Sequence, residues 1–160
     1  MTHLVYLSLG TNLGNKEENL RTAMTLIEEQ VGTITSQSAL YASAPWGFDS
    51  ENTFLNNAIS VETSLTPEEL LSTTQHIDRT LGRTHKSVDG QYSDRLIDID
   101  ILLYDDVVMH TPSLILPHPL MHRRLFVLEP LSEIAPTMIH PLLQKEITTL
   151  CNELKAEGTC

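Results

Sequence analysis

The stretch that most constrains the fold is RLIDIDILL, residues 95–103. Its isoleucines alternate with Asp98 and Asp100, which is the period-two pattern of a strand with one apolar face. The two carboxylates then share the opposite face, about 6.6 Å apart along the backbone at roughly 3.3 Å per residue. Because two negative charges at that spacing repel each other, the pattern favours a cation bound between them.

The chemistry around this strand fits a metal-assisted phosphate site. Carboxylate oxygens suit Mg²⁺, and paired ions about 3.5–4 Å apart recur in phosphoryl transfer. Arg95 stands just before the strand, and a guanidinium is suited to bidentate phosphate contact. The alternative is an amphipathic edge strand whose aspartates face water. Asp is a poor strand former, so the metal interpretation is favoured.

Length and composition indicate one globular domain spanning residues 1–160. No apolar run approaches the ~18 residues of a membrane span. The N-terminus lacks the pattern of a secretory signal, and Cys151 and Cys160 lack metal-ligand spacing. We therefore expect a reduced, cytoplasmic protein that does not associate with membranes, and a monomer.

The net charge of −11 argues against a general nucleic-acid binder. Its distribution is informative. Residues 79–124 hold six basic and six acidic residues, whereas the remainder holds four basic and fifteen acidic ones. A neutral window around an aspartate pair in an acidic protein favours a polyphosphate site; charges scattered over a solvated surface are the alternative.

Periodicity predicts strands at 4–9, 34–42, 54–63 and 96–104. One helix is expected to begin at Asn15 and another at Thr66, because each has a glutamate three residues later in a capping-box pattern. Gly10 is expected to end the first strand, with residues 9–14 as a turn. The resulting order, βαββαβ, predicts a ferredoxin-like α+β sandwich. A hairpin at 105–116, a short helix within 117–128 and a helix at 143–154 would form a C-terminal extension.

Two residues of the predicted strand 54–63 could recognise a flat heterocycle. Phe54 and Asn56 have the same parity and point to one face; an aromatic ring can stack on a heterocycle, and a carboxamide offers both donors and an acceptor. Trp46, the only tryptophan, lies nearby in the turn-like segment 43–47. An ordinary core aromatic and an exposed loop ring are the alternatives.

Further downstream, His118 and His122 are four residues apart and could share a helical face that binds a metal. No HExxH glutamate accompanies them, so phosphate contact together with Arg123 and Arg124 is favoured.

Several of these motifs together resemble the 6-hydroxymethyl-7,8-dihydropterin pyrophosphokinases, from residue 6 to about residue 136. The matching segments are YLSLGTNLG (6–14), FLNNA (54–58), LTPEELL (65–71), RxxDIDIL (95–102) and PHPxMxxRxF (117–126). Four places differ from the family pattern. Asp78 stands where Glu is usual, and His85 where a second arginine is common. Residues 91–94 lack the usual basic residue and small or Gly-Pro pair, and Pro119 stands where an aromatic residue is frequent.

This resemblance implies a Mg²⁺-dependent diphosphotransferase of folate biosynthesis, which transfers pyrophosphate from ATP to the pterin hydroxymethyl group and releases AMP. Asp98 and Asp100 would hold two Mg²⁺ ions and, with Arg83 and Arg95, form the catalytic group. The implied pterin pocket consists of Ser43, Ala44, Trp46, Phe54, Asn56 and Phe126. The implied ATP-binding residues are Gln75, Asp78, Arg83, Lys86, Arg95, Ile101, His118 and Arg124.

Two other functions remain open on the sequence. A ferredoxin-like regulatory module would bind a small molecule without catalysis, and a two-metal nuclease would also use an aspartate pair, although the acidic composition disfavours it. AMP formation that depends on pterin separates the three. The polar segment 83–94, with Gly90 as a hinge, is further predicted to act as a lid.

Overall fold

The computed structural model describes residues 2–12, 14–43, 54–82 and 97–157. The predicted lid, residues 83–94, lies outside these ranges. The described elements are, in chain order, β1 (His3–Thr11), α1 (Lys16–Gln30), β2 (Gly32–Gln37), β3 (Tyr41–Ser43), β4 (Phe54–Thr63), α2 (Pro67–Gly82), β5 (Asp98–Tyr104), β6 (Met109–His110), β7 (Ile115–Leu116), the 3₁₀ helix η1 (Met121–Arg123), α3 (Leu125–Ile134) and α4 (Ile147–Ala156).

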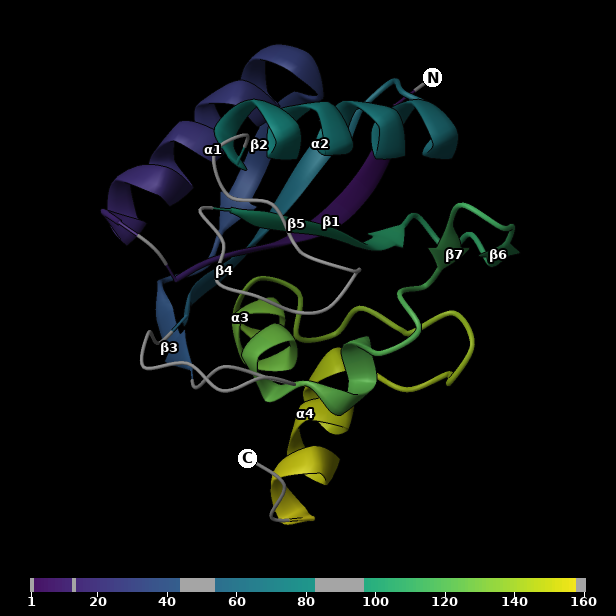
Figure 1. Cartoon of the computed structure of the whole chain (residues 1–160). Helices are drawn as coiled ribbons and strands as arrows, with labels where there is room; N and C mark the ends of the chain where they lie inside the picture. Colours follow the sequence, from purple (N-terminus) through teal and green to yellow (C-terminus); the bar gives the residue numbers. More distant parts are fainter. Residues whose placement is uncertain (1, 13, 44–53, 83–96, 158–160) are drawn as a thin grey trace.

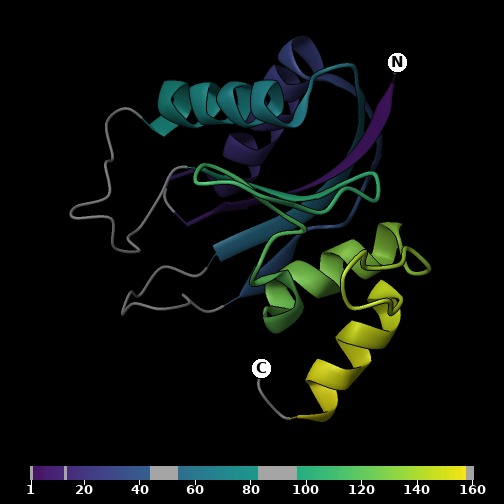
Figure 2. The same ribbon diagram turned by 90° about the vertical axis from the view of Figure 1, so that its right-hand side faces the viewer.

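The main sheet is antiparallel, with the strand order β2-β4-β1-β5. β2 pairs with the last residues of β4, while β3 pairs with its first residues, 54–56. β6 and β7 form a separate hairpin. Helices α1 and α2 cover one face of the sheet and α3 covers the other, with α4 against α3 (Figures 1 and 2). The chain is therefore an α+β protein with helices on both faces of an antiparallel sheet.

The two helix starts expected from the sequence are confirmed. The Asn15 side chain accepts a hydrogen bond from the Glu18 amide at 3.1 Å and caps α1. Before α2, the Glu69 amide donates to the Thr66 hydroxyl and the Glu69 carboxylate accepts from the Thr66 amide. This is a complete capping box, and it satisfies backbone donors that a helix start leaves unpaired.

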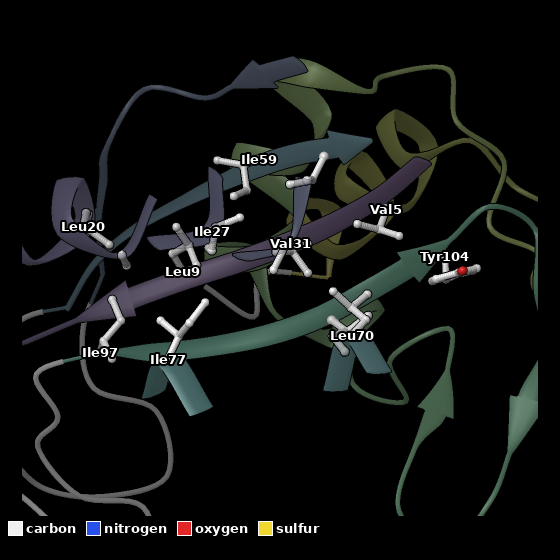
Figure 3. Packing of buried hydrophobic residues seen from close by; sticks show 14 of the residues in the cluster. Val5, Leu9, Leu20, Ile27, Val31, Ile59, Leu70, Ile77, Ile97 and Tyr104 are labelled. Atoms are coloured by element: carbon white, nitrogen blue, oxygen red, sulfur yellow. The ribbon is translucent and has the colours of Figure 1, made fainter. Parts of the chain in front are cut away.

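Two apolar clusters hold the sheet between its helices. On the α1–α2 face, Val5, Leu7 and Leu9 of β1 are fully buried among helix residues such as Leu20 and Ile77 (Figure 3). The isoleucines at 97, 99 and 101 join this cluster, as their alternation predicts. On the opposite face, Tyr6, Ala58 and Leu102 belong to a second cluster with residues of α3 and α4. Because successive side chains of a strand point to opposite faces, β1 contributes residues to both clusters.

The predicted strand 34–42 is interrupted between β2 and β3. The Ser38 hydroxyl accepts a hydrogen bond from the Ala58 amide, and the next amide, that of Ala39, donates to the Glu133 carboxylate of α3 at 3.1 and 3.2 Å. The Ser38 amide still donates to the Ala58 carbonyl at 2.9 Å. The Ala39 amide, however, is bound by a side chain of α3 and not by β4, so one continuous strand becomes two.

The C-terminal half also differs from expectation. Within 117–128 there is a 3₁₀ turn, then an extended residue at Arg124 (φ −125°, ψ 107°), and only then α3. α3 continues to Ile134 because Val127, Leu128 and Leu131 are buried in the second cluster. The predicted hairpin after β5 is confirmed, whereas the last helix begins at Ile147 and not at residue 143.

The first strand does not end at Gly10. β1 continues through Gly10 to Thr11, and Gly10 pairs with residues on both neighbouring strands. The glycine that turns the chain is Gly14, whose φ of 65° favours a residue without a Cβ. Among the described residues, no helix is long and apolar enough to cross a membrane.

Candidate active site

Polar residues of both neighbouring strands lie opposite one end of the central strand β1. Gly10 lies opposite Asn56 of β4 on one side and Asp98 of β5 on the other. One pair further along, Ser8 lies opposite Asp100. Since directly opposed residues point to the same face, Asn56 and both aspartates share the face that carries α3. The predicted metal and heterocycle residues are therefore neighbours across one strand.

A pocket of about 360 Å³ lies along β5, the edge strand of the sheet. Five residues predicted to bind ATP or metal line it, from three separate segments: Gln75 and Asp78 of α2, Asp100 and Ile101 of β5, and His118. The tip of the β6–β7 hairpin, residues 111–114, completes the wall. This hairpin was not predicted to belong to the site, because its TPSL sequence carries no chemical signature that marks it.

His118 is held so that one ring nitrogen faces the aspartates. Its Nδ1 accepts a hydrogen bond from the Leu120 amide at 3.1 Å, and its Nε2 lies 3.9 Å from the Asp100 Oδ1. Burial, and then the charge of Arg124, lower the pKa of His118 to about 4. At neutral pH the ring is therefore uncharged, and because Nδ1 is the acceptor, the proton is at Nε2. His118 presents a neutral donor beside Asp100.

His122 is directed elsewhere. Its ring packs edge-on against that of His140, with ring centroids 6.3 Å apart. His118 and His122 therefore lie in different surroundings. The alternative of a shared helical metal site is wrong, because residues 121–123 form only a 3₁₀ turn that begins after His118.

Arg124 and Phe126 stand at the start of α3. Arg124 is 5% exposed, and its guanidinium carbon lies 5.6 Å from the centre of the Phe126 ring, within cation–π range. Arg124 is the residue before the first helical turn, where backbone amides favour negative charge. This part of the site combines a cation with an aromatic face.

The heterocycle side of the site is built on β4 and β3. Asn56 is 2% exposed, and its Nδ2 donates to the Tyr41 carbonyl at 3.4 Å. The Tyr41 hydroxyl donates to Glu133 of α3 at 2.6 Å, and this carboxylate raises the pKa of Tyr41 to about 12. Phe54 is half-buried and pairs with the backbone of Ser43. A chain of contacts from α3 through Tyr41 thus supports the carboxamide.

The predicted metal ligands are a pair and not a cluster. Among the described residues, no three His, Cys, Asp or Glu side chains converge as a metal site would require. Mg²⁺ nevertheless needs few protein ligands, because it keeps several waters and binds substrate phosphates through one or two carboxylates. Asp98 and Asp100, half-exposed at the same end of β5, fit that kind of site. Several predicted site residues lie outside the described part of the chain: Ala44, Trp46, Arg83, Lys86, Arg95 and the side chain of Ser43.

Comparison with known proteins identifies the family. Residues 6–136 match the family described as 7,8-dihydro-6-hydroxymethylpterin-pyrophosphokinase. The chain belongs to this family. The resemblance drawn from the motifs is thereby confirmed.

Two curated pyrophosphokinases are similar to this chain over most of their own length. A 2-amino-4-hydroxy-6-hydroxymethyldihydropteridine pyrophosphokinase of Porphyromonas gingivalis is 46% identical over 139 residues, which cover 86% of this chain and 94% of that protein. The enzyme of the same name from Bacillus subtilis is 42% identical, over 84% of this chain and 79% of that protein.

A solved structure shares the fold. Wild-type HPPK-DHPS of Plasmodium falciparum superposes with a TM-score of 0.83 at 18% identity, over 98% of this chain and 45% of that one. The likeness extends to the α+β arrangement of the whole chain.

Proposed function

We propose that this chain transfers a pyrophosphate group from ATP to the hydroxymethyl group of 6-hydroxymethyl-7,8-dihydropterin in folate biosynthesis. The hydroxyl oxygen bonds to the β-phosphorus, the bond from that phosphorus to the α,β-bridging oxygen breaks, AMP departs with that oxygen, and the hydroxyl proton is released. The observation that carries the proposal is the family match over residues 6–136, which includes both aspartates.

The pocket beside β5 is the proposed nucleotide site. Gln75 and Asp78 form its α2 wall and Ile101 its floor. His118 would donate a hydrogen bond from Nε2 to a phosphate oxygen. An uncharged N–H donor can approach both a phosphate and the nearby Asp100 carboxylate. Arg124 would add a positive charge next to the phosphates, and we assign Arg83, Lys86 and Arg95 to the same task.

Asp98 and Asp100 are the proposed ligands of two Mg²⁺ ions. When bound, Mg²⁺ neutralises the polyphosphate and holds its oxygens in a reactive orientation. The chain's own contribution is to keep the two carboxylates on one face, in register with Gly10 and Ser8 of β1. This rigid backing places the ligands before substrate arrives.

The pterin ring is proposed to bind across the row formed by Asn56, Gly10 and Asp98. Asn56 would hydrogen-bond the heterocycle edge, while Phe54 and Phe126 stack on its faces; Ser43, Ala44 and Trp46 would complete the pocket. In this pose the hydroxymethyl group would point toward Asp98, which lies opposite Gly10 on β5, the strand beside the nucleotide pocket.

The described strands and helices also support the predicted fold class. The strand order β2-β4-β1-β5 and the helices α1 and α2 on one face support a ferredoxin-like βαββαβ unit, with β3 and the segments after β5 as additions. We propose that the chain acts as a single domain and a monomer in the cytoplasm.

The test is a direct assay. Purified protein is incubated with ATP, MgCl₂ and 6-hydroxymethyl-7,8-dihydropterin, and AMP is separated and quantified. We expect AMP to form only when pterin and Mg²⁺ are both present. Pterin binding without AMP would favour the regulatory module; cleavage of DNA under the same conditions would favour the nuclease. Either result would overturn the proposal.

A further inference from the structure

Gly10 occupies a position inside a strand where glycine needs a reason. A glycine in a strand interior packs no side chain and loses backbone entropy on folding, and it often marks a close approach by another group. Gly10 lies within β1, paired on both sides, and its backbone does not adopt the left-handed conformation that would demand glycine. The reason must therefore be space.

The space above Gly10 is filled by two residues of the proposed pterin pocket. A Cβ placed at position 10 would lie 2.9 Å from the Asn56 Oδ1 and 3.6 Å from a ring carbon of Phe54. The first distance is shorter than a carbon and an oxygen can approach without repulsion, whereas the second is ordinary contact. Only the carboxamide would have to move.

The carboxamide has little freedom to move without losing its present arrangement. Asn56 is 2% exposed and donates from Nδ2 to the Tyr41 carbonyl at 3.4 Å. A push on Oδ1 from the β1 side would rotate the amide away from β1 and disturb that contact. The backbone, by contrast, would meet nothing that forces the strand apart.

Gly32 provides the contrast within the same protein. A Cβ there would lie 2.0 Å from the backbone oxygen of Glu62 and 2.9 Å from its carbonyl carbon. The β2–β4 pairing itself would have to open, so glycine at position 32 protects the fold. At position 10 a Cβ would displace a side chain and leave the sheet paired.

We propose that Gly10 is a positioning residue for pterin recognition: the missing Cβ lets the Asn56 carboxamide lie over β1, in the row that leads from β4 to Asp98. This inference rests on the proposed function. It predicts that a single methyl group at position 10 weakens pterin binding without altering the nucleotide pocket. The residues that line that pocket come from α2, β5 and the segment 111–119.

The test is Gly10→Ala, measured by calorimetric titration with 6-hydroxymethyl-7,8-dihydropterin and, separately, with a non-hydrolysable ATP analogue plus Mg²⁺. We expect the Kd for pterin to rise about tenfold or more, as follows from losing one or two hydrogen bonds. The Kd for the ATP analogue should stay within about twofold, and thermal unfolding should remain cooperative. Equal weakening of both ligands, or unchanged pterin affinity, would overturn the inference.

A double-mutant cycle with Asn56→Ala isolates the contact. Once the carboxamide is gone, Gly10→Ala should have no further effect on pterin affinity; additive losses would contradict the proposal. If Gly10→Ala alone does not fold, the double variant should fold because the obstructing atoms are absent, and an unfolded double variant would count against the proposal. Gly32→Ala should instead lower thermal stability.

Failure of the two proposals can be distinguished. If the wild-type protein neither binds pterin nor forms AMP, the proposed function is wrong. If the wild type does both and Gly10→Ala does so equally well, the function stands and only the positioning role of Gly10 is wrong.

Discussion

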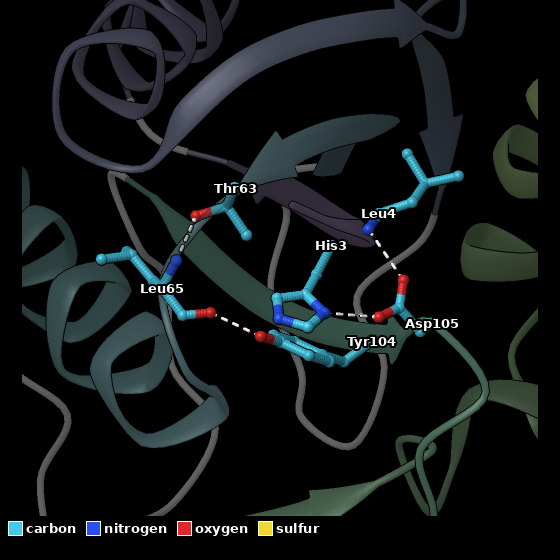
Figure 4. A network of polar contacts seen from close by, with 6 residues as sticks. All are labelled: His3, Leu4, Thr63, Leu65, Tyr104 and Asp105. Carbon is cyan, nitrogen blue, oxygen red and sulfur yellow. Dashed lines mark hydrogen bonds and ion pairs between the residues drawn. The ribbon is translucent and has the colours of Figure 1, made fainter. Parts of the chain in front are cut away.

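The two ends of the β1–β5 strand pair use their polar residues in opposite ways. At one end, the Asp105 carboxylate accepts hydrogen bonds from the Leu4 amide at 2.8 Å and from the His3 Nδ1 at 2.7 Å (Figure 4). The Tyr104 hydroxyl donates to the Leu65 carbonyl beside it, and the Tyr104 ring lies 4.8 Å from that of His3. These contacts join β1, β5 and the segment before α2.

At the other end, Asp98 and Asp100 stand two residues apart on one face of β5, beside a pocket. One carboxylate with donors on both oxygens stabilises a sheet, whereas two carboxylates on one strand face offer oxygens that can share a bound cation. The same residue type on the same strand pair therefore stabilises the fold at one end and forms the proposed binding site at the other.

The largest effect is expected at the end that carries Asp98 and Asp100. Asp98→Asn and Asp100→Asn each remove a charged Mg²⁺ ligand, so AMP formation should fall roughly 10²–10³-fold. The apolar face of β5 is untouched, so both variants should still unfold cooperatively on heating. Initial rates at saturating Mg²⁺ and a thermal scan measure both. Near-wild-type turnover would refute the metal assignment.

The next effect concerns the pterin side. Phe54→Ala should weaken pterin binding by about 0.5–1.5 kcal/mol beyond the loss of buried area, because a stacking partner is removed. Binding of an ATP analogue should be nearly unchanged, since Phe54 lies on β4 and does not line the pocket along β5. Fluorescence titration with each ligand compares them. A parallel loss for both would show that the two subsites are not separate.

At the end that carries Asp105, the expected effect is on stability and not on turnover. Asp105→Ala removes the acceptor of the Leu4 amide, which should cost about 1 kcal/mol in the free energy of unfolding, because the carboxylate is partly exposed. Asp105→Asn is the matched control: it keeps an acceptor and tolerates the φ of 49° at this position better than Ala. Urea unfolding should rank Asp105→Ala below Asp105→Asn, with kcat unchanged in both; a loss of kcat would contradict the separation of the two ends.

The smallest effect is a pH dependence away from both ends. His140 is 3% exposed, and its Nδ1 accepts from the Leu142 and Leu143 amides. Burial, and then His122, lower its pKa below the ordinary value. The unfolded chain therefore binds a proton more readily, so the stability that the neutral ring contributes is present above about pH 6.5 and is lost as the pH falls below it.

His140→Asn preserves an acceptor for the two amides but does not titrate. As the pH is lowered from 7 to 5, the wild type should therefore lose more unfolding free energy than His140→Asn does. Parallel pH profiles for the two proteins would show that His140 does not titrate differently on unfolding.

Local sequence predicted those features that depend on neighbours along the chain. The alternation of Ile97, Ile99 and Ile101 with two aspartates predicted a strand with one buried face, and the structure places the isoleucines in the α1–α2 core. Both helix starts followed from capping residues three positions apart. Such signals are reliable because a helix cap or a strand face involves only residues within a turn or two of each other.

Other features could not be read locally. Gly10 looked like the end of a strand because a glycine after an alternating run usually is one; only its distance to Asn56, 46 positions later in the chain, reveals the close approach. The break between β2 and β3 depends on Glu133 of α3, which accepts the Ala39 amide. In both cases the deciding partner is remote in sequence.

Sequence alone was enough to predict most of the strands and helices, the aspartate pair and the family. Which residues meet depended on tertiary packing: Gln75, Asp100 and His118 line one pocket, and burial and Arg124 lower the pKa of His118. Periodicity and capping are short-range properties of the backbone, whereas burial, charge proximity and free space arise only when distant segments pack together.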